Sequence, residues 1–453
     1  MLRETFRRLA MDIGPLRDSR PFRDVFIART VSVFGIGMLA VALPVQVYAM
    51  TGSTVHVGAV SAAEGFALLA GFLWGGVLAD RHDRRRLMLR ARIFAGVGFA
   101  LLTLNAFLPS PSLAALYVLA AWDGFATGIS VTALLAATPA LVRPDKLVAA
   151  GALNALTVRL GSMLSPALGG VVVSAFGVGW NYAAAALGTL GTVTLLTRLP
   201  ALPPAEDGEV ADQNPLRAIG SGLHFVATHR VVGSLMLLGL LFMVAGGIPV
   251  LMPAFAEHAL DGGPTTVGLL YAAPACGAVL ASVTSGWAGR SRRPGRALLT
   301  ASVAGFAALA CLGLARHPAL AVAILFGYGF VASVEEILRY GLIQTHTPAS
   351  HLGRVNALWA AQETGGEAVG AIGAGALGRY LAPGAAIVVY GTVSAVLALM
   401  LALTLTGLRT ATLGPGAAPD DAGPDAGTGT GTGTDTGTGP GSGVALDAGP
   451  EPR

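Results

Sequence analysis

Apolar stretches of about 20 residues recur along this chain, and short polar segments separate them. A transmembrane helix needs about 20 mostly apolar residues, because the hydrocarbon core of a bilayer is about 30 Å thick. The pattern therefore predicts an all-α membrane protein with about twelve transmembrane helices. Their expected bounds are Phe22–Met50, Val57–Ala79, Leu87–Leu108, Leu113–Ala136, Val148–Phe176, Trp180–Leu199, Val231–Phe255, Thr265–Gly289, Ala297–Ala315, Ala319–Leu342, Val355–Leu381 and Gly384–Leu408.

The composition agrees with this class. Hydrophobic residues make up 53% of the chain and charged residues 12%. The 62 glycines and 26 prolines often fall inside apolar stretches, where membrane helices tolerate them. The net charge of +4 is interpreted as basic loops at a membrane surface and not as nucleic-acid binding. The two cysteines, Cys276 and Cys311, lie in separate apolar segments, so we expect no disulfide framework, metal site or cofactor.

Basic residues alternate between the loops, which predicts the orientation in the membrane. They gather in the arm before residue 22 and in every second loop: Arg81 to Arg92, Arg143 with Lys146, Arg290 to Arg296, and Arg354. Short cytoplasmic loops collect Lys and Arg, so both termini are expected in the cytoplasm. The first apolar stretch is too long for a cleavable signal peptide and is expected to remain as a membrane helix.

The chain divides into five expected parts. A basic arm (1–21) precedes a six-helix half (22–199), an acidic, proline-containing linker (200–230) and a second six-helix half (231–408). The last part, 409–453, is rich in glycine and threonine and is expected to be disordered, because it has little apolar surface to bury.

The two halves are sequence repeats. Gly286 follows Gly76 by 210 residues, and each opens an arginine-rich loop. The same spacing relates Val57-Gly58 to Val267-Gly268, and a spacing of 209 relates Pro44 to Pro253. Two like-oriented halves of six helices are the architecture of major facilitator transporters, in which the halves rock about a site near the middle of the membrane.

The first arginine-rich loop resembles a motif of that superfamily, Gly-x-x-x-Asp-Arg-x-Gly-Arg-Arg. The matching residues are Gly76, Asp80, Arg81, Arg84 and Arg85, whereas Asp83 replaces the second glycine. We expect Gly76 to permit close helix packing and Asp80 to accept hydrogen bonds from arginines, or to cap a helix, across the junction of the halves. Such contacts form a conformational lock that opens as the halves move. The alternative is that the arginines only mark the cytoplasmic surface.

A second motif lies in the fifth expected helix. It resembles the exporter pattern Gly-x-x-x-Gly-Pro-x-x-Gly-Gly, with the residues Gly161, Ser165, Pro166, Gly169 and Gly170. Small residues let a neighbouring helix approach, and proline bends the helix. In the superfamily this pattern accompanies export. The alternative is tight packing without directional meaning.

Charged residues inside the expected helices are the candidates for a binding or proton site, since each costs about 2.5–3.5 kcal/mol at the bilayer centre unless it is paired or hydrated. Asp123 and Arg159 both fall near mid-membrane. We expect them to face the interior of the first half, as an ion pair or with Asp123 as a proton carrier; a permanently paired strut is the alternative. The arginine of the exporter subgroup's fourth helix is missing, because Ala120 occupies its position.

The second half contributes further carboxylates. Glu335 and Glu336 precede Arg339 closely enough for a local ion pair. Glu363 and Glu367 share one helix face at i,i+4, where joint ionisation is unfavourable, and are better site candidates. Glu64 is a further candidate.

Several runs resemble one branch of the superfamily, the enterobactin exporters. They are Phe22–Arg29, Gly75–Arg81, Ala121–Phe125, Val131–Val142, Leu156–Gly170, Gly268–Ala273 and Gly353–Trp359. The resemblance implies a secondary active exporter of a siderophore, driven by protons and acting as a monomer in the bacterial cytoplasmic membrane.

Two alternatives remain open from the residues alone. The acidic candidates would suit a broad-specificity drug:proton antiporter for cationic or neutral amphiphiles. A more remote alternative is an intramembrane prenyl-diphosphate enzyme that binds magnesium through Asp80 and Asp83, but the symmetric loop from Arg290 to Arg296 carries no carboxylate. We therefore expect no enzyme activity.

Overall fold

The computed structural model describes residues 14–203, 215–291 and 293–412. All of them belong to one unit, Met1–Gly414, and Pro415–Arg453 forms a second unit outside the described residues. The regular structure of the described part is helical, without strands. Most of the predicted basic arm and nearly all of the predicted disordered tail lie outside it.

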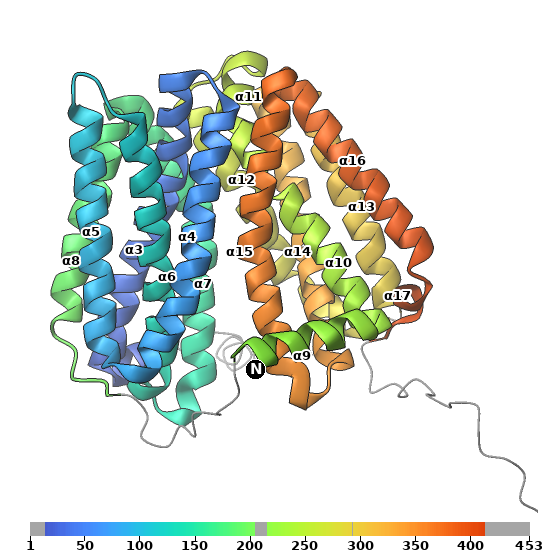
Figure 1. Cartoon of the computed structure of the whole chain (residues 1–453), viewed down its shortest axis with the longest axis horizontal. Helices are drawn as coiled ribbons and strands as arrows, with labels where there is room; N and C mark the ends of the chain where they lie inside the picture. The colour runs from blue at the N-terminus through green and yellow to red at the C-terminus, as the bar shows by residue number, and fades with distance from the viewer. Residues whose placement is uncertain (1–13, 204–214, 292, 413–453) are drawn as a thin grey trace, which may run out of the picture. The chain divides into compact units, whose positions relative to one another are not determined.

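The first half contains six long helices, coloured blue to green in Figure 1. They are α3 (Arg20–Thr51), α4 (Thr54–Arg81), α5 (Arg84–Phe107), α6 (Leu113–Leu141), α7 (Leu147–Phe176) and α8 (Val178–Leu196), with the short α2 (Gly14–Asp18) before them and the 3-10 turn η1 (Pro144–Lys146) before α7. The Ser19 side chain accepts a hydrogen bond from Phe22 N and begins α3, and Gly52, at φ 60°, ends it in the left-handed region that favours glycine.

The second half repeats this arrangement with one broken helix. Its elements are α10 (Arg230–Ala245), η2 (Ile248–Leu251), α11 (Met252–Ala259), α12 (Pro264–Val283), η3 (Ser285–Arg290), α13 (Pro294–Leu312), α14 (Pro318–His346), α15 (Ala349–Tyr380), α16 (Pro383–Thr404) and α17 (Thr406–Thr410). Each of the twelve predicted stretches contains a helix. The largest differences are in four helices. The helix expected over 231–255 breaks after Ala245, and the helix expected over 265–289 ends at Val283. Helix α15 begins at Ala349 instead of Val355, and α6 ends at Leu141 instead of Ala136.

The break after Ala245 lies where the chain meets α15. Gly247 lies directly against the backbone of α15, where a Cβ would come within 2.6 Å of Ala371 N. The carbonyl of Val244 accepts a hydrogen bond of 3.2 Å from Gly247 N in place of an α-helical partner, and a second one of 2.6 Å from Tyr390 Oη. A side chain that reaches in from α16 thus satisfies the interrupted backbone, as a buried polar group requires.

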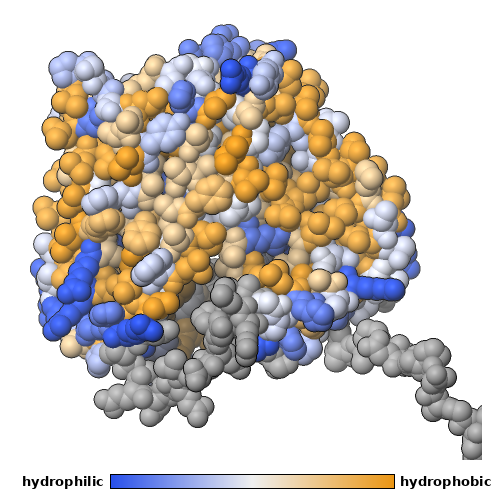
Figure 2. All heavy atoms as spheres, viewed as in Figure 1, coloured by the Kyte–Doolittle hydropathy of each residue, from blue (hydrophilic) through white to orange (hydrophobic). Residues whose placement is uncertain are grey.

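The helices form a multi-pass membrane protein. Ten helices in the described part of the chain are long and apolar enough to cross a bilayer, and α8 and α15 are not among them. Figure 2 shows apolar residues over much of the middle of the surface and hydrophilic residues near its upper and lower edges. Large apolar side chains such as Leu187 and Val283 are mostly exposed on that surface, which fits contact with lipid.

The segment expected as a linker contains a helix of its own. Helix α9 (Pro215–Thr228) lies across one end of α15 (Figure 1). A Cβ at Gly222 would stand 3.1 Å from Arg354 Cβ and 3.3 Å from Leu358 Cδ1, so the two helices are in contact. We call the end of the helix bundle that carries α9 the linker face; α4, α6 and α8 end there, and α5, α7 and α10 begin there. The opposite end is the far face.

The two halves contact each other closely on the far-face side. Thr54 Oγ1, at the start of α4, donates to Gly375 O at 2.9 Å, and Tyr48 Oη and His258 Nε2 share a hydrogen bond of 2.9 Å. A Cβ at Gly170 of α7 would come within 2.9 Å of Gly268 Cα on α12. Nearer the linker face, α4 packs instead on α6 of its own half, through Gly71 and Gly75.

Candidate functional site

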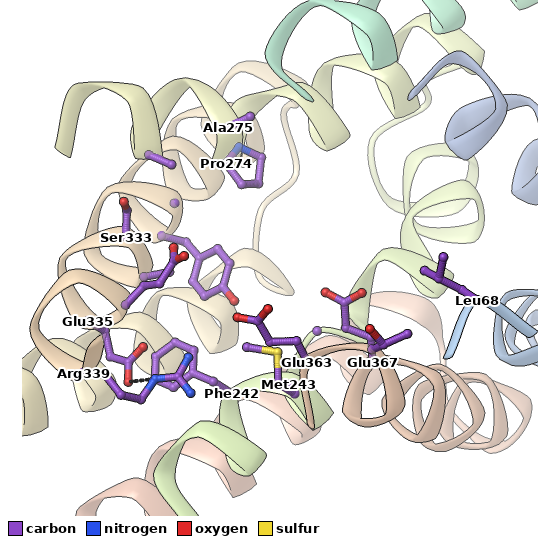
Figure 3. A pocket seen from close by; sticks show the side chains of 17 residues that line it. Leu68, Phe242, Met243, Pro274, Ala275, Ser333, Glu335, Arg339, Glu363 and Glu367 are labelled. Atoms are coloured by element: carbon purple, nitrogen blue, oxygen red, sulfur yellow. Dashed lines mark ion pairs between the residues drawn. The ribbon is translucent and has the colours of Figure 1, made fainter. Parts of the chain in front are cut away.

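A cavity of about 540 Å³ lies where α14 and α15 face α4, α10 and α12 (Figure 3). Its walls combine apolar and acidic side chains. The lining residues are Leu68, Phe242, Met243, Gly246, Pro274, Ala275, Ala278, Tyr328, Gly329, Ala332, Ser333, Glu335, Glu336, Arg339, Glu363, Thr364 and Glu367. Four carboxylates and one guanidinium therefore surround this space, and all five come from the second half.

The one arginine of the lining, Arg339, forms an ion pair with Glu335. Arg339 Nε lies 3.2 Å from Glu335 Oε1, and both side chains are 1% exposed. The contact is an ion pair and not an aligned hydrogen bond. The guanidinium also lies 4.6 Å from the centre of the Trp359 ring. This buried pair joins adjacent turns of α14. Among the described residues, Glu363 and Glu367 are the two carboxylates of the cavity without an ion pair.

Glu363 and Glu367 lie on one face of α15 and both reach the cavity (Figure 3). Trp359 Nε1 donates a hydrogen bond of 2.5 Å to Glu363 Oε1, which orients that carboxylate. The i,i+4 spacing of the pair in the sequence is what brings both to the same space.

A second cavity, of about 260 Å³, continues from the first toward the far face. It shares Leu68, Gly246, Thr364 and Glu367 with the first and adds Glu64 from α4 and Tyr271 from α12. Two carboxylates that the sequence offered separately, Glu64 and Glu367, thus line one space from opposite halves. The broken segment between α10 and α11 also contributes its glycines here, as interrupted helices do at transporter sites.

One hypothesis from the sequence paired Arg159 with Asp123, but the structure does not place these two residues in an ion pair. The Nη2 atom of Arg159 lies 4.0 Å from Glu336 Oε2 on α14, so it pairs across the two halves. The side chains are 39% and 47% exposed. A half-exposed pair at this distance contributes at most about 1 kcal/mol, which makes it a contact that can open and close.

Asp123 lies apart from both cavities, inside the first half. Its side chain is 2% exposed, and Oδ1 has no hydrogen-bond partner among the described residues. The charges that interact with it come from Arg92 on α5 and Glu64 on α4. Sequence reasoning counted Arg92 among the loop arginines and missed it, although its place nine residues into α5 was a usable signal.

The arginine-rich loop between α4 and α5 binds the beginning of the linker. Asp83 Oδ1 accepts from Arg86 N and Oδ2 accepts from Leu202 N, both at 2.8 Å. Arg84 N donates to Leu202 O at 2.8 Å, and Arg85 Nη2 donates to Thr197 O at 2.6 Å. Asp83, the departure from the superfamily motif, is therefore a helix cap that also holds the chain leaving α8.

The close packing expected at Gly76 is absent: no neighbouring atom in the described part of the chain lies within 4 Å of a Cβ placed there. The neighbouring Gly75 makes that contact, since its Cβ would come within 2.8 Å of Ile129 Cα on α6. Arg81 is exposed. The side chain of Asp80, on which the lock hypothesis depends, lies outside the described residues.

The glycine-rich motif of α7 packs this helix against two neighbours. Gly161 lies against Val33, and Gly169 lies against the backbone of Met38, both on α3. Ser165 is fully buried against Gly37 of α3, and its Oγ donates to Gly161 O at 2.5 Å, next to Pro166. Gly170 faces Gly268 of the other half. The motif thus connects packing within the first half to the junction of the halves.

The chain resembles known proteins along most of its length. It is 43% identical to the enterobactin exporter EntS of Citrobacter koseri over 399 residues, which cover 88% of this chain and 95% of that protein. The enterobactin exporters EntS of Shigella boydii serotype 18 and of Escherichia coli O139:H28 are each 42% identical over the same shares.

Solved structures agree on the fold alone. The nucleoside transporter NupG (D323A mutant) matches with a TM-score of 0.71 at 12% identity, covering 86% of this chain and 100% of that one. A POT family transporter in complex with 5-aminolevulinic acid matches with a TM-score of 0.68 at 13% identity, covering 86% and 97%.

The relatives and the fold neighbours are transporters and not enzymes, so the prenyl-diphosphate hypothesis is not supported. A model of the transmembrane secretion effector family matches residues 10–416. The chain therefore belongs to the transmembrane secretion effector family of major facilitator transporters, and its substrate is a small molecule.

Proposed function

We propose that this protein exports a siderophore of the enterobactin class across the bacterial cytoplasmic membrane by alternating access. The observation that carries the proposal is the 42–43% identity to enterobactin exporters over 88% of the chain. The cavity of about 540 Å³ has the volume of a small-molecule binding site and could hold the transported solute.

The proposed orientation places the linker face and both termini in the cytoplasm, with the chain acting as a monomer. The basic loops of the sequence support this, because cytoplasmic loops collect arginine. The contacts at Thr54 and Gly170 then close the outer side. In this conformation a solute would enter the cavity from the cytoplasm.

Export then requires the two halves to close at the linker face and part at the far face. The junction between Gly170 and Gly268 would have to open, and the Arg159–Glu336 pair is weak enough to rearrange. The loop motif of Gly76, Asp80, Arg81, Arg84 and Arg85 is proposed as the lock of one conformer, with Asp83 holding the linker to it.

Proton coupling is proposed to use the carboxylates of the cavities and of the first half. Glu64 and Glu367 line one space from opposite halves, so a proton held there would respond to their separation. Asp123 is buried beside Arg92 and is the second candidate, with Glu363 as the third. Proton-driven efflux in vesicles should fall in Asp123→Asn and Glu64→Gln; unchanged efflux would remove the residue concerned from the relay.

The export hypothesis is tested by deleting the gene in its host under iron limitation. We expect the siderophore to accumulate inside the cells and to decline in the medium, and plasmid-borne protein to reverse both changes. A variant with Gly268→Leu, which blocks the junction of the halves, is the matched negative control for complementation. Equal siderophore levels in the deletion and parent strains would contradict the proposal.

One observation favours a second candidate, a drug:proton antiporter. Two carboxylates of the cavity, Glu363 and Glu367, have no ion pair among the described residues, and such a lining attracts cationic amphiphiles. If the deletion strain became sensitive to cationic drugs while its siderophore export stayed normal, this alternative would replace the first.

A further inference from the structure

A groove on the outer surface of the second half is not part of the transport path. It has a volume of about 550 Å³ and runs between α13 and α16. Both helices are long and apolar enough to span the membrane. The groove begins at the linker face, where Arg296 stands in the first turn of α13 and Arg409 in α17.

The walls of the groove suit hydrocarbon. Along α13, Thr300, Ala304 and Ala307 follow Arg296 at helical spacing and leave a shallow trough. Leu399 and Leu403 of α16 form the other wall and are 48% and 61% exposed. Apolar side chains so exposed on a membrane helix are solvated by acyl chains.

The two arginines are held together by a close backbone contact. Gly295 lies directly against the carbonyl of Leu408, where any side chain would overlap. Arg296 follows Gly295 in the sequence and Arg409 follows Leu408, so the two arginines stand at the same end of the groove. Arg409 Nε donates to Ala402 O at 2.7 Å, which fixes its guanidinium at the end of α16.

Neither arginine is neutralised by the described part of the protein. No aspartate or glutamate lines the groove there, and neither guanidinium has an ion pair among the described residues. Two unpaired guanidinium groups above an apolar trough are complementary to one molecule with a phosphate head and hydrocarbon chains.

The first half has a cavity that differs from this groove in position and charge. It has a volume of about 340 Å³, lies between α4, α5 and α6, and carries Arg86 and Arg90 above apolar side chains such as Phe94 and Phe125, but Asp83 also lines it. Arg86 precedes Arg296 by 210 residues, the spacing of the internal repeat.

We propose that the groove between α13 and α16 is a binding site for an anionic phospholipid. Arg296 and Arg409 bind the phosphate at the linker face, and one acyl chain lies along Thr300, Ala304 and Leu403. The site is separate from the cavity between the halves, so it does not depend on the identity of the transported solute.

The test uses the full-length protein, purified in detergent, stripped of lipid and titrated with phosphatidylglycerol or phosphatidylcholine. Native mass spectrometry counts bound lipid. We expect phosphatidylglycerol to bind more tightly than phosphatidylcholine, and the double variant Arg296→Ala with Arg409→Ala to weaken phosphatidylglycerol binding at least about tenfold, because each basic residue near an anionic lipid contributes about 1 kcal/mol.

Two further variants separate a built site from a general surface charge. Arg316→Ala removes an exposed arginine beyond the other end of α13 and should leave lipid binding unchanged. Ala304→Leu fills the trough without altering charge and should weaken binding. Equal binding of the two lipids by the wild type, or a double variant that behaves like Arg316→Ala, would overturn the proposal and leave the arginines as topological markers. Normal binding by Ala304→Leu would overturn the assigned groove.

Discussion

Arg159 of the first half lies 4.0 Å from Glu336 of the second half, and this ion pair joins the two halves on the linker-face side of their close contacts. The sequence had suggested Asp123 as the partner of Arg159, but Asp123 is buried elsewhere in the first half. A weak ionic contact thus connects two bodies whose relative motion is the basis of transport.

Breaking this pair should shift the conformational equilibrium modestly. We expect Arg159→Ala or Glu336→Gln to change the population of the linker-face-open conformer by up to about fivefold, because a half-exposed pair contributes at most about 1 kcal/mol. Distances between spin labels on α4 and α14 measure that population. The exchanged variant Arg159→Glu with Glu336→Arg should restore the wild-type distribution; if it does not, the pair does not set the equilibrium.

The buried pair of Glu335 and Arg339 should matter for stability instead. Arg339→Met leaves a carboxylate buried without its partner, and we expect a loss of about 3–5 kcal/mol, visible as a large fall in melting temperature in detergent. Adding Glu335→Leu should recover most of the loss, since no uncompensated charge then remains. The control is Glu336→Gln, which removes a carboxylate that is half-exposed. This variant should have a melting temperature near that of the wild type.

The acidic lining predicts a preference for the metal-free siderophore. Metal binding removes protons from the ligand oxygens and leaves an anionic complex, which Glu363 and Glu367, the cavity carboxylates without an ion pair among the described residues, should repel. In proteoliposomes the free siderophore should move faster than its gallium(III) complex. Glu363→Gln with Glu367→Gln should reduce this ratio about tenfold or more, whereas Glu257→Gln, at an exposed position of α11 outside the cavity, should not. A ratio near one in the wild type would refute the assignment; transport of neither form would refute the proposed function.

Gly75 and Gly76 form a matched pair for testing helix packing. Gly75→Ala places a methyl group 2.8 Å from Ile129 Cα, so it should force α4 away from α6 and destabilise the protein by about 1–3 kcal/mol. Gly76→Ala meets no atom within 4 Å and should melt like the wild type. A stable Gly75→Ala variant would show that the two helices do not pack this closely.

His229 predicts a dependence of stability on pH at the start of α10. Its Nδ1 accepts a hydrogen bond from Val232 N, which requires the neutral ring. Burial, with a smaller effect of His346, lowers the pKa of His229 below its ordinary 6.5. The folded state thus binds the proton less readily than the unfolded chain, so this stability is present above pH 6.5 and declines as the pH falls below it.

Melting temperatures measured between pH 7.5 and pH 5.5 check this. Asn is also a good helix cap but does not titrate in this range, so His229→Asn should melt with a weaker pH dependence than the wild type. Identical pH dependence in the two proteins would assign the effect to other groups.

Much of this architecture follows from local sequence pattern. The length and spacing of apolar stretches predicted the helices, because membrane helices satisfy their own backbone hydrogen bonds and need only sufficient apolar length. Local spacing also predicted an ion pair of Arg339 with Glu335 or Glu336, which the structure gives to Glu335, and a shared face for Glu363 and Glu367. The repeat of 210 residues predicted two equivalent halves without any knowledge of their contacts.

The tertiary structure decided everything that depends on which helices meet. It paired Arg159 with Glu336, brought Glu64 and Glu367 to one cavity, gave Asp123 a neighbour in Arg92, and assigned the packing contact to Gly75. It also broke the helix after Ala245, where Gly247 lies against the backbone of α15. Helical periodicity determines which residues share a face, but only the packing of side chains between helices determines what that face meets.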